Sequence, residues 1–350
     1  MFTGRARLLR VGRVLIFLEE LILLVERDKI YSSERPTREK GGKRMIPLAI
    51  GIKEWLEQYK KNSVKVATYD RLETSYNMLL RHPISDISDE ELCTEDIQGY
   101  VNDLVSEGYA LTTIRKQYFL IRAYLEFSLV SGRIHSPIHQ AVKLPAESVV
   151  KKRRKEVVCY TEDEQRALLR VIRTHERPAY AIAQLILETG MRVGEALALC
   201  WEDVLWHRKA ISINKTMVRI ANRKKMLVQN GAKSYTSNRV IPLNESAYRL
   251  LSDTHELAKC KRSYIFVDRY GDPLTYEAVR YQIQFACAKA GLPYLGIHVF
   301  RHTFATNCYN RGCDVKILSK LLGHADVAIT YNTYIHLYGD ALEEMRKVLG

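Results

Sequence analysis

The chain has 350 residues, of which 47% are hydrophobic, and it carries a formal net charge of +14 at pH 7. This length suffices for two ordinary domains, and the excess of cations favours a polyanionic partner such as nucleic acid, with a basic enzyme that has no such partner as the alternative. The seven cysteines include no C-x-x-C pair, which argues against a metal finger or a disulfide framework and indicates a reducing, cytoplasmic location.

Residues 1–45 form a basic arm whose role the sequence does not reveal. The apolar run at 14–25 is short and contains Glu19 and Glu20, so we do not expect it to span a membrane. The same glutamates, and the lack of a small-residue cleavage site, argue against a signal peptide. We predict an amphipathic helix here, followed by a polar linker over residues 30–45.

Residues 46–144 show helical periodicity throughout. Four short helices are expected. The first contains Trp55, and the second begins after Ser63 as its N-cap. The third is capped by Thr94, and the fourth runs from about Leu111 to near Gly132. Four short helices in about a hundred residues predict a compact all-helical domain.

Residues 145–160 read as a basic linker between two domains. Its centre is a run of five consecutive cations, Lys151, Lys152, Arg153, Arg154 and Lys155. Such a run is extended in water, and on a duplex it would neutralise phosphates and release counterions. We expect it to bind DNA, and a solvated linker without a ligand is the alternative.

Residues 161–350 predict a second domain, in which helices surround a small sheet. Thr161 and Glu164 have the spacing of a capping box at its start. The alternating Ile211 and Ile213, and later the β-branched segment 240–243, predict strands. Helices are expected at 167–172, 179–187, 193–199, 275–291, 298–309, 314–322 and 340–348. The predicted fold class is therefore mainly α with a small β-sheet.

Two arginines of this second domain stand where an anion could bind. Gly190 interrupts a helix, and Arg192 starts the next one, so its guanidinium adds to the positive end of a helix dipole. The alternative is a surface arginine paired with Glu195, one turn later. His298 and Arg301 are three residues apart and face one side of a helix near its N-terminus.

A zinc site at this helix is disfavoured. His298 and His302 have the i, i+4 spacing of H-E-x-x-H, but Val299 replaces the glutamate and no third ligand is evident. We therefore expect no metal.

The last motif region contains His324 and three tyrosines. His324 follows Gly323 at a predicted helix C-terminus, which favours an imidazolium, so His324 could supply a proton or a charged donor. Tyr331, Tyr334 and Tyr338 lie close together, and by periodicity alone each is more often a packing residue than a nucleophile.

Taken in order, these motifs resemble the tyrosine recombinase or phage-type integrase family. The pattern is R…H-x-x-R…L-G-H…Y, carried by ETGMRVGEAL, HVFRHTFAT, LLGHADVAIT and the region of Tyr334, and AKSYTSNRVIPL is similar to the family's lysine-bearing hairpin. The resemblance covers residues 161 to about 338. It implies an α+β catalytic domain over 161–350 and a core-binding, DNA-binding domain over 46–144.

The resemblance also implies a role for each matching residue. The two arginines that grip the scissile phosphate correspond to Arg192 and Arg301, and the two histidine positions to His298 and His324. Tyr334, ten residues after His324, corresponds to the nucleophile, so Tyr331 and Tyr338 are interpreted as packing residues.

Lys233 corresponds to the lysine that helps to expel the leaving oxygen, although Lys224 and Lys225 lie nearby and hairpin loops vary in length. His298 is the candidate acceptor of the tyrosine proton. Because the bond is stored as a phosphotyrosine, neither metal nor ATP is expected as a cofactor.

The function implied is site-specific recombination of double-stranded DNA through a 3′-phosphotyrosine, for integration and excision of a mobile element or prophage. A synaptic homo-tetramer is expected, with a monomer off DNA as an allowed state, in the cytoplasm and associated with the nucleoid. The alternatives are a type IB topoisomerase-like enzyme and a non-catalytic DNA-binding protein of the same fold.

Overall fold

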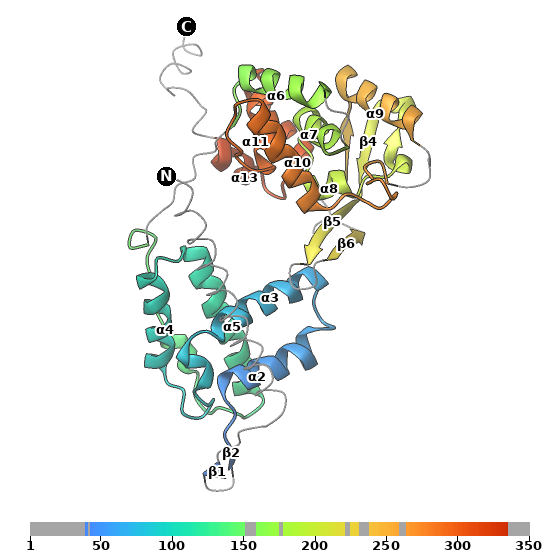
Figure 1. Cartoon of the computed structure of the whole chain (residues 1–350). Coiled ribbons are helices and arrows are strands. Elements are labelled where there is room, and N and C mark those ends of the chain that lie inside the picture. Colours follow the sequence, from blue (N-terminus) through green and yellow to red (C-terminus); the bar gives the residue numbers. More distant parts are fainter. Residues whose placement is uncertain are drawn as a thin grey trace, which may run out of the picture. The chain divides into compact units, whose positions relative to one another are not determined.

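The computed structural model describes residues 39–40, 43–150, 159–174, 178–220, 225–230, 238–258 and 264–334 (Figure 1). The chain divides into two compact units, residues 1–153 and 154–350. Within the ranges just given, no helix combines the length and the apolar character that a membrane crossing requires.

The first unit is a small helical bundle. Its main helices are α2 (Leu48–Trp55), α3 (Val66–Leu79), α4 (Thr94–Ser106) and α5 (Leu111–Val130), preceded by the antiparallel two-residue strands β1 (Glu39–Lys40) and β2 (Lys43–Arg44). A π-helical turn, Leu56–Lys60, extends α2, and short 3₁₀ helices occupy Pro83–Asp86 and Ile138–Ala141. Leu48, Ile52, Tyr100, Ile114 and Tyr124 are among the buried side chains of its core.

Two helix caps predicted for this unit were wrong. Ser63 does not cap α3, because its hydroxyl donates instead to the backbone oxygen of Tyr59 at 2.6 Å, and α3 begins after Lys65. Thr94 is already inside α4, where its hydroxyl donates to the oxygen of Ile138 at 2.8 Å. In both cases another carbonyl within reach of the hydroxyl competes with the capping geometry.

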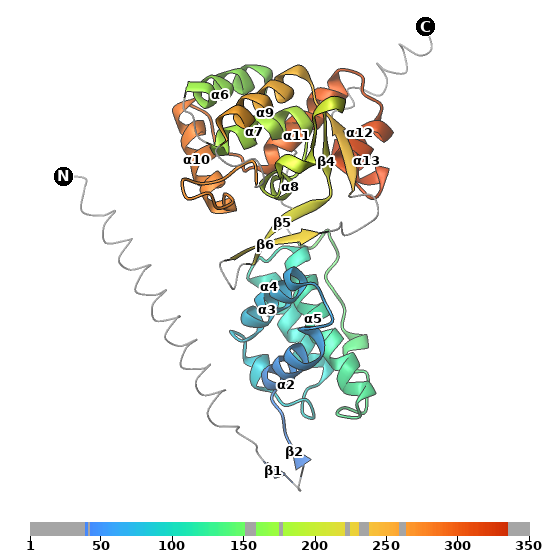
Figure 2. The same ribbon diagram turned by 90° about the vertical axis from the view of Figure 1, so that its right-hand side faces the viewer.

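The second unit has helices packed around a small sheet (Figure 2). Its helices are α6 (Glu162–Thr174), α7 (Pro178–Thr189), α8 (Val193–Leu197), α9 (Glu245–Leu257), α10 (Tyr276–Lys289), α11 (His298–Asn310), α12 (Val315–Leu322) and α13 (Val327–Tyr334). The strands are β3 (Val204–Leu205), β4 (Ala210–Ile213), β5 (Lys215–Ile220), β6 (Lys225–Asn230) and β7 (Arg239–Pro242). β3, β4 and β7 form an antiparallel sheet in that order, and β5 and β6 form a separate hairpin.

Helix α7 is the centre of this unit. Nine of its residues are buried, and it contacts α6, α8, α9, α10 and α11. The capping box predicted ahead of α6 is confirmed, because the Glu164 carboxylate accepts from the amide of Thr161 at 2.8 Å and the Thr161 hydroxyl accepts from the amide of Glu164 at 3.3 Å. The fold is thus mainly helical with a small sheet, as the sequence predicted.

Two glycines set the path of the chain around α8. Gly190 ends α7 at φ +66°, and a Cβ there would lie 2.3 Å from a ring carbon of Phe304, so both backbone and packing require glycine. A Cβ on Gly194 would lie 2.5 Å from the backbone oxygen of Met217 in β5. Helix α8, which follows Arg192, is therefore packed directly on the β5–β6 hairpin.

Candidate active site

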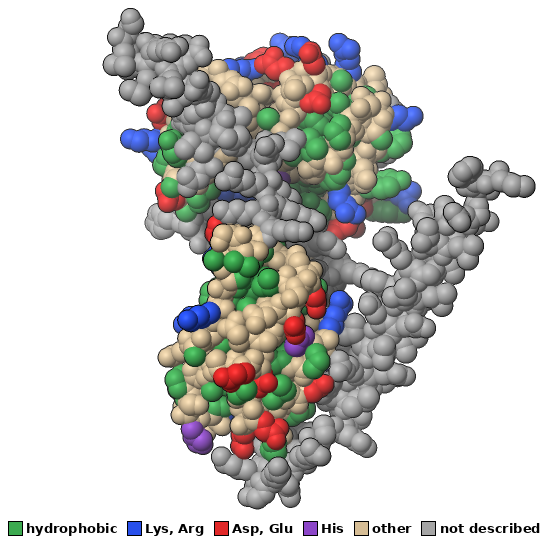
Figure 3. Space-filling view, turned by 90° about the vertical axis from the view of Figure 1, so that its left-hand side faces the viewer, with side chains coloured by type: hydrophobic (Ala, Val, Ile, Leu, Met, Phe, Trp, Pro, Cys, Tyr) green, Lys and Arg blue, Asp and Glu red, His purple; other side chains and the backbone are tan. Residues whose placement is uncertain are grey.

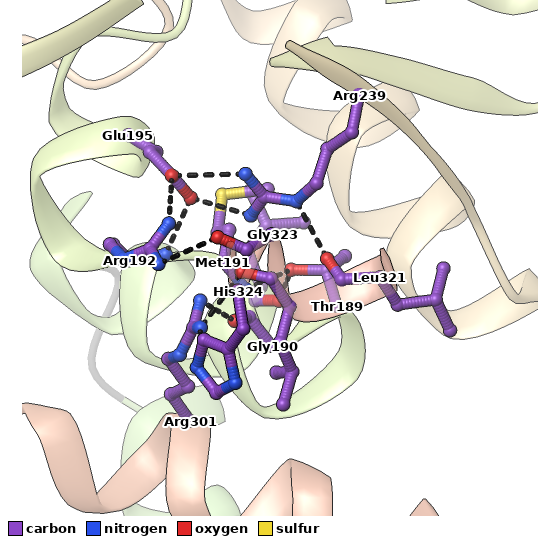
Figure 4. A network of polar contacts seen from close by, with 12 residues as sticks. Thr189, Gly190, Met191, Arg192, Glu195, Arg239, Arg301, Leu321, Gly323 and His324 are labelled. Atoms are coloured by element: carbon purple, nitrogen blue, oxygen red, sulfur yellow. Dashed lines mark hydrogen bonds and ion pairs between the residues drawn. The ribbon is translucent and has the colours of Figure 1, made fainter. Parts of the chain in front are cut away.

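A buried ion pair lies at the centre of the candidate site (Figure 4). The two Nη atoms of Arg239 donate to the two carboxylate oxygens of Glu195, at 3.0 and 2.7 Å. The side chains of Arg239 and Glu195 are only 7% and 5% exposed. Burial alone would raise the pKa of Glu195, but the hydrogen bonds and charge of Arg239, together with the charge of Arg192, outweigh it and lower the pKa.

Arg192 extends this ion pair toward solvent. Glu195 accepts from the backbone amide of Arg192 at 2.8 Å and from its Nη1 at 2.9 Å, so Arg192 is held at the N-terminus of α8. Its Nη2 donates to the backbone oxygen of Gly323 at 3.0 Å. The side chain is still 36% exposed, which leaves a guanidinium that a ligand can reach. The ion pair with Glu195 that the sequence offered as an alternative is therefore present.

Arg301 lies deeper, on the buried face of α11. Its Nη1 donates to the backbone oxygen of Gly190 at 2.9 Å, and its Nη2 donates to that of Leu322 at 2.8 Å. The same Nη2 lies 2.8 Å from Nε2 of His324. Arg301 thus joins the turn before α8 to the turn after α12, two segments that are far apart in the sequence.

The partners of His324 define its protonation state. An arginine only donates, so Nε2 of His324 must accept from Arg301, and the ring proton lies on Nδ1, 2.7 Å from the hydroxyl of Thr330. Burial, followed by the charges of Arg301, Arg192 and Arg239, lowers the pKa of His324 to about 4. The helix C-terminus favours an imidazolium, whereas burial and, after it, the charges of three guanidinium groups favour the neutral ring.

The other two histidines of the motif lie on α11. His298 is partly exposed at the first position of the helix, and His302 is half-buried one turn later. Desolvation, then the charges of Arg301 and Arg192, lower the pKa of His298. A neutral imidazole can accept a proton, so His298 has the state that a general base needs.

The part of the chain that the structure describes contains no group of three or more metal-binding side chains.

The comparisons with known proteins agree with this geometry. A sequence model described as the phage integrase family matches residues 159–340, just over half of the chain. The chain belongs to this family. Among curated relatives, the tyrosine recombinase XerC-like protein of Caldanaerobacter subterraneus subsp. tengcongensis is 23% identical over 81% of this chain and 77% of its own length. The tyrosine recombinase XerC of Staphylococcus saprophyticus is 26% identical over 83% and 91%, respectively.

Solved integrases share the fold of this chain. The Tn1549 transposon integrase, in complex with a circular intermediate DNA, has a TM-score of 0.72 at 18% identity and covers 87% of this chain and 100% of its own. The lambda integrase tetramer bound to a Holliday junction has a TM-score of 0.60 at 17% identity and covers 83% and 77%. The family match and the curated relatives identify the chain as a tyrosine-type site-specific DNA recombinase, and the solved integrases agree with it in fold.

The predicted catalytic residues of this integrase are only partly brought together. Arg192, Arg301 and His324 share one network, and the charges of both arginines act on His298. Tyr334 is the last residue of α13, and its side chain lies outside the described part of the structure. Lys233 and the linker cations Lys151, Lys152, Arg153, Arg154 and Lys155 also lie outside the described residues.

Two members of the network, Arg239 and Thr330, were not predicted from the integrase sequence. A signal for Arg239 was present: in a strand, residues two apart share a face, and Ile241 is an apolar core position. Arg239 therefore points inward with Ile241, while Val240 between them is 45% exposed. An inward-facing arginine must find buried partners. No such signal marks Thr330, because its role depends on the fold around His324.

Proposed function

We propose that this integrase cuts and rejoins double-stranded DNA through a 3′-phosphotyrosine bond to Tyr334, and that it integrates and excises a mobile element. The observation that carries the proposal is the shared network of Arg192, Arg301 and His324, which presents two fixed guanidinium groups beside one imidazole. Fixed cations of this kind stabilise the charge that builds on a phosphodiester in its transition state.

The position of α13 supports Tyr334 as the nucleophile. Thr330 is hydrogen-bonded to His324, so the helix is attached to the network at that residue. Position 334 lies four residues later, on the same face of the helix. Tyr331 is 45% exposed and one residue after Thr330, on a different face. The helix register therefore favours Tyr334 over Tyr331.

The proposed reaction is an in-line transesterification. The Tyr334 oxygen attacks the phosphorus and loses its proton to His298, while the bond from phosphorus to the 5′ oxygen breaks. Lys233 gives a proton to the departing oxygen, and Arg192 and Arg301 bind the non-bridging oxygens. Attack by a 5′ hydroxyl of a second strand reverses these steps and reseals the DNA. The phosphate's negative charge, placed beside His324, would raise its pKa again.

We also propose that the first unit binds DNA through α5. Arg115, Lys116 and Arg122 are exposed on this helix, with Phe119 50% exposed among them. Basic side chains interleaved with an aromatic suit a phosphate backbone. The segment from 86 to 107 instead exposes acidic side chains, and Figure 3 shows acidic groups gathered on the lower part of this unit. DNA is expected to avoid that face, and the linker cations 151–155 would add phosphate contacts.

The assembly proposed for recombination is a homo-tetramer on two DNA duplexes. The support is the likeness to lambda integrase, which has been solved as a tetramer bound to a Holliday junction. An enzyme that acts on chromosomal DNA would be found in the cytoplasm with the nucleoid.

The test is covalent capture on a nicked suicide substrate that carries the target site. Wild type is expected to form an adduct that survives denaturation, and Tyr334→Phe is expected to form none, since the phenol oxygen is lost. Tyr331→Phe is the matched control and should retain the adduct. Both variants should bind the DNA within about twofold of wild type, because the phenol is not a phosphate contact. Adduct formation by Tyr334→Phe would refute the assignment.

A further inference from the structure

Three arginines bind three successive backbone oxygens at the C-terminus of α12. Arg239 Nε donates to Leu321 at 2.6 Å, Arg301 to Leu322 at 2.8 Å and Arg192 to Gly323 at 3.0 Å. The last carbonyls of a helix lack intrahelical donors and carry partial negative charge, so they attract cations. The segment that places His324 is therefore held by guanidinium groups from three different elements.

Arg239 differs from Arg301 in the partners of its two Nη atoms: those of Arg239 donate to the Glu195 carboxylate, whereas those of Arg301 donate to the backbone oxygens of Gly190 and Leu322. Its side chain is 7% exposed, and its Nε and both Nη atoms already have partners in Leu321 and Glu195. It also lies against Gly323, where an added Cβ would be 2.9 Å from its Nη1. The charge of Arg239 is balanced by the Glu195 carboxylate, so we expect Arg239 to act through its neighbours.

The neighbour that matters is Glu195. This buried carboxylate lies between Arg239 and Arg192, and it accepts from both. Opposite charges attract strongly where water is excluded. With Arg239 in place, one positive charge balances Glu195, and the charge of Arg192 is left over. Without Arg239, Glu195 would draw the guanidinium of Arg192 toward both of its oxygens and away from Gly323.

We propose that Arg239 is a positioning residue that neutralises Glu195, and so keeps the charge and the fork of Arg192 available to the scissile phosphate. Its Nε contact fixes Leu321 and, with it, the turn that carries His324. The inference rests on the proposed function, because it deepens the account of the same site.

The test is a double-mutant cycle on the full chain, read as the first-turnover rate of adduct formation. Arg239→Met should lower the rate about a hundredfold, as loss of one transition-state contact does. Glu195→Gln should lower it about tenfold, because Arg192 loses an anchor and keeps its charge. The double variant should return to within about tenfold of wild type, because no uncompensated carboxylate remains. Arg249→Met, at an exposed ion pair on α9, is the matched control and should be unchanged.

Rescue by the second mutation distinguishes charge balance from packing. If Arg239 only fills space, the double variant will be as slow as Arg239→Met or slower, and that result would overturn the proposal. Arg239→Lys keeps the charge and loses the fork, so it serves if Arg239→Met does not fold. It should stay within about tenfold of wild type. A hundredfold loss in a natively folded Arg239→Lys would also overturn the inference.

A second readout does not depend on cleavage. The ring resonances of His324 can be followed by NMR while inorganic phosphate is added, and Arg239→Met should weaken phosphate binding about tenfold, with recovery in the double variant. Unchanged phosphate affinity would overturn the role of Arg239 whatever the cleavage assay shows. A wild type that binds phosphate and forms no adduct would instead refute the proposed function alone.

Discussion

The buried arginine network of the second unit and the buried pair Asp89 and His139 of the first unit differ in how their polar atoms are paired. In the second unit, Arg239, Arg301 and Glu195 are at most 7% exposed, and each has hydrogen-bonded partners. In the first unit, Asp89 is hydrogen-bonded through one oxygen to Tyr124, while its other oxygen has no partner among the described residues. The two nitrogens of His139 are likewise buried without a hydrogen bond within the described part of the chain.

This difference separates a site from an incidental burial. A buried polar group without a full set of partners destabilises a fold, and where the group can titrate, burial shifts its pKa toward the neutral form. Asp89 follows this rule, because burial raises its pKa to about 6. The arginines of the second unit keep their charges, and their partners fix the direction of each fork. A network of fixed cations next to an exposed edge, here Arg192, is what an anionic substrate requires.

The largest expected effect on the rate of adduct formation comes from replacing either arginine that binds the phosphate. The two replacements also compare a buried with a partly exposed member of the network. Arg301→Gln and Arg192→Gln should each slow adduct formation by about a hundredfold or more. Their effects on stability should differ. Loss of Arg301 removes the donor to the buried backbone oxygens of Gly190 and Leu322, whereas Arg192 is 36% exposed. We expect a loss of about 3 kcal/mol for Arg301→Gln and about 1 kcal/mol for Arg192→Gln.

Urea unfolding of the same protein samples measures the loss of stability. Glu195 keeps Arg239 when Arg192 is replaced, so Arg192→Gln leaves no buried charge unpaired. If Arg192→Gln proved the more destabilising of the two, Arg192 would be the structural member of the network and the ranking by burial would be wrong.

A smaller effect is expected where α13 joins the network. Thr330→Val keeps the shape of a buried side chain and removes the hydroxyl that pairs with Nδ1 of His324. Adduct formation should slow about tenfold, because one hydrogen bond that orients the imidazole is lost. Thr333→Val, one turn nearer Tyr334, is the control, since the Thr333 hydroxyl donates to the backbone oxygen of Ile329 within its own helix. Equal rates for the two variants would show that the hydrogen bond from His324 to α13 does not contribute to the reaction.

Much of this site was readable from the sequence because its chemistry is local. Arg192, His298, Arg301 and His324 stand at predicted helix ends, and the structure places them there. Arg239 was missed because its partners, Glu195 and Leu321, are contributed by segments far away in the chain. The lowered pKa of His324 could not be predicted either, because it depends first on burial and then on three guanidinium groups, and only the tertiary fold supplies both.

The fold followed the same rule. The boundaries of α5 and α7, which periodicity and glycine mark, were predicted closely, whereas the caps at Ser63 and Thr94 were not. A hydroxyl has several acceptors within reach, and the choice between them depends on neighbouring chain segments such as the one that contains Ile138.

The dependence of stability on pH tests the comparison between the two units. The pKa of His324 is lowered to about 4 from an ordinary value of 6.5, so the unfolded chain binds a proton that the folded chain rejects. Stability of the second unit from this group is full above pH 6.5 and falls as the pH drops toward 4. The pKa of Asp89 is raised to about 6 from 3.8, so the folded first unit takes up the proton, and stability rises as the pH falls from 6 toward 4.

As the pH falls, the free energies of unfolding of the two units should therefore change in opposite directions, each by about 2–3 kcal/mol at most. Tryptophan fluorescence separates them, because Trp55 lies in the first unit and Trp201 and Trp206 in the second. Urea unfolding of a Trp55→Phe protein at pH 7, 5.5 and 4.5 measures the stability of the second unit. Adding His324→Gln should make the decline of this stability with falling pH less steep. If the stability of His324→Gln declined as steeply as that of its parent, the imidazole of His324 would not be the group that titrates.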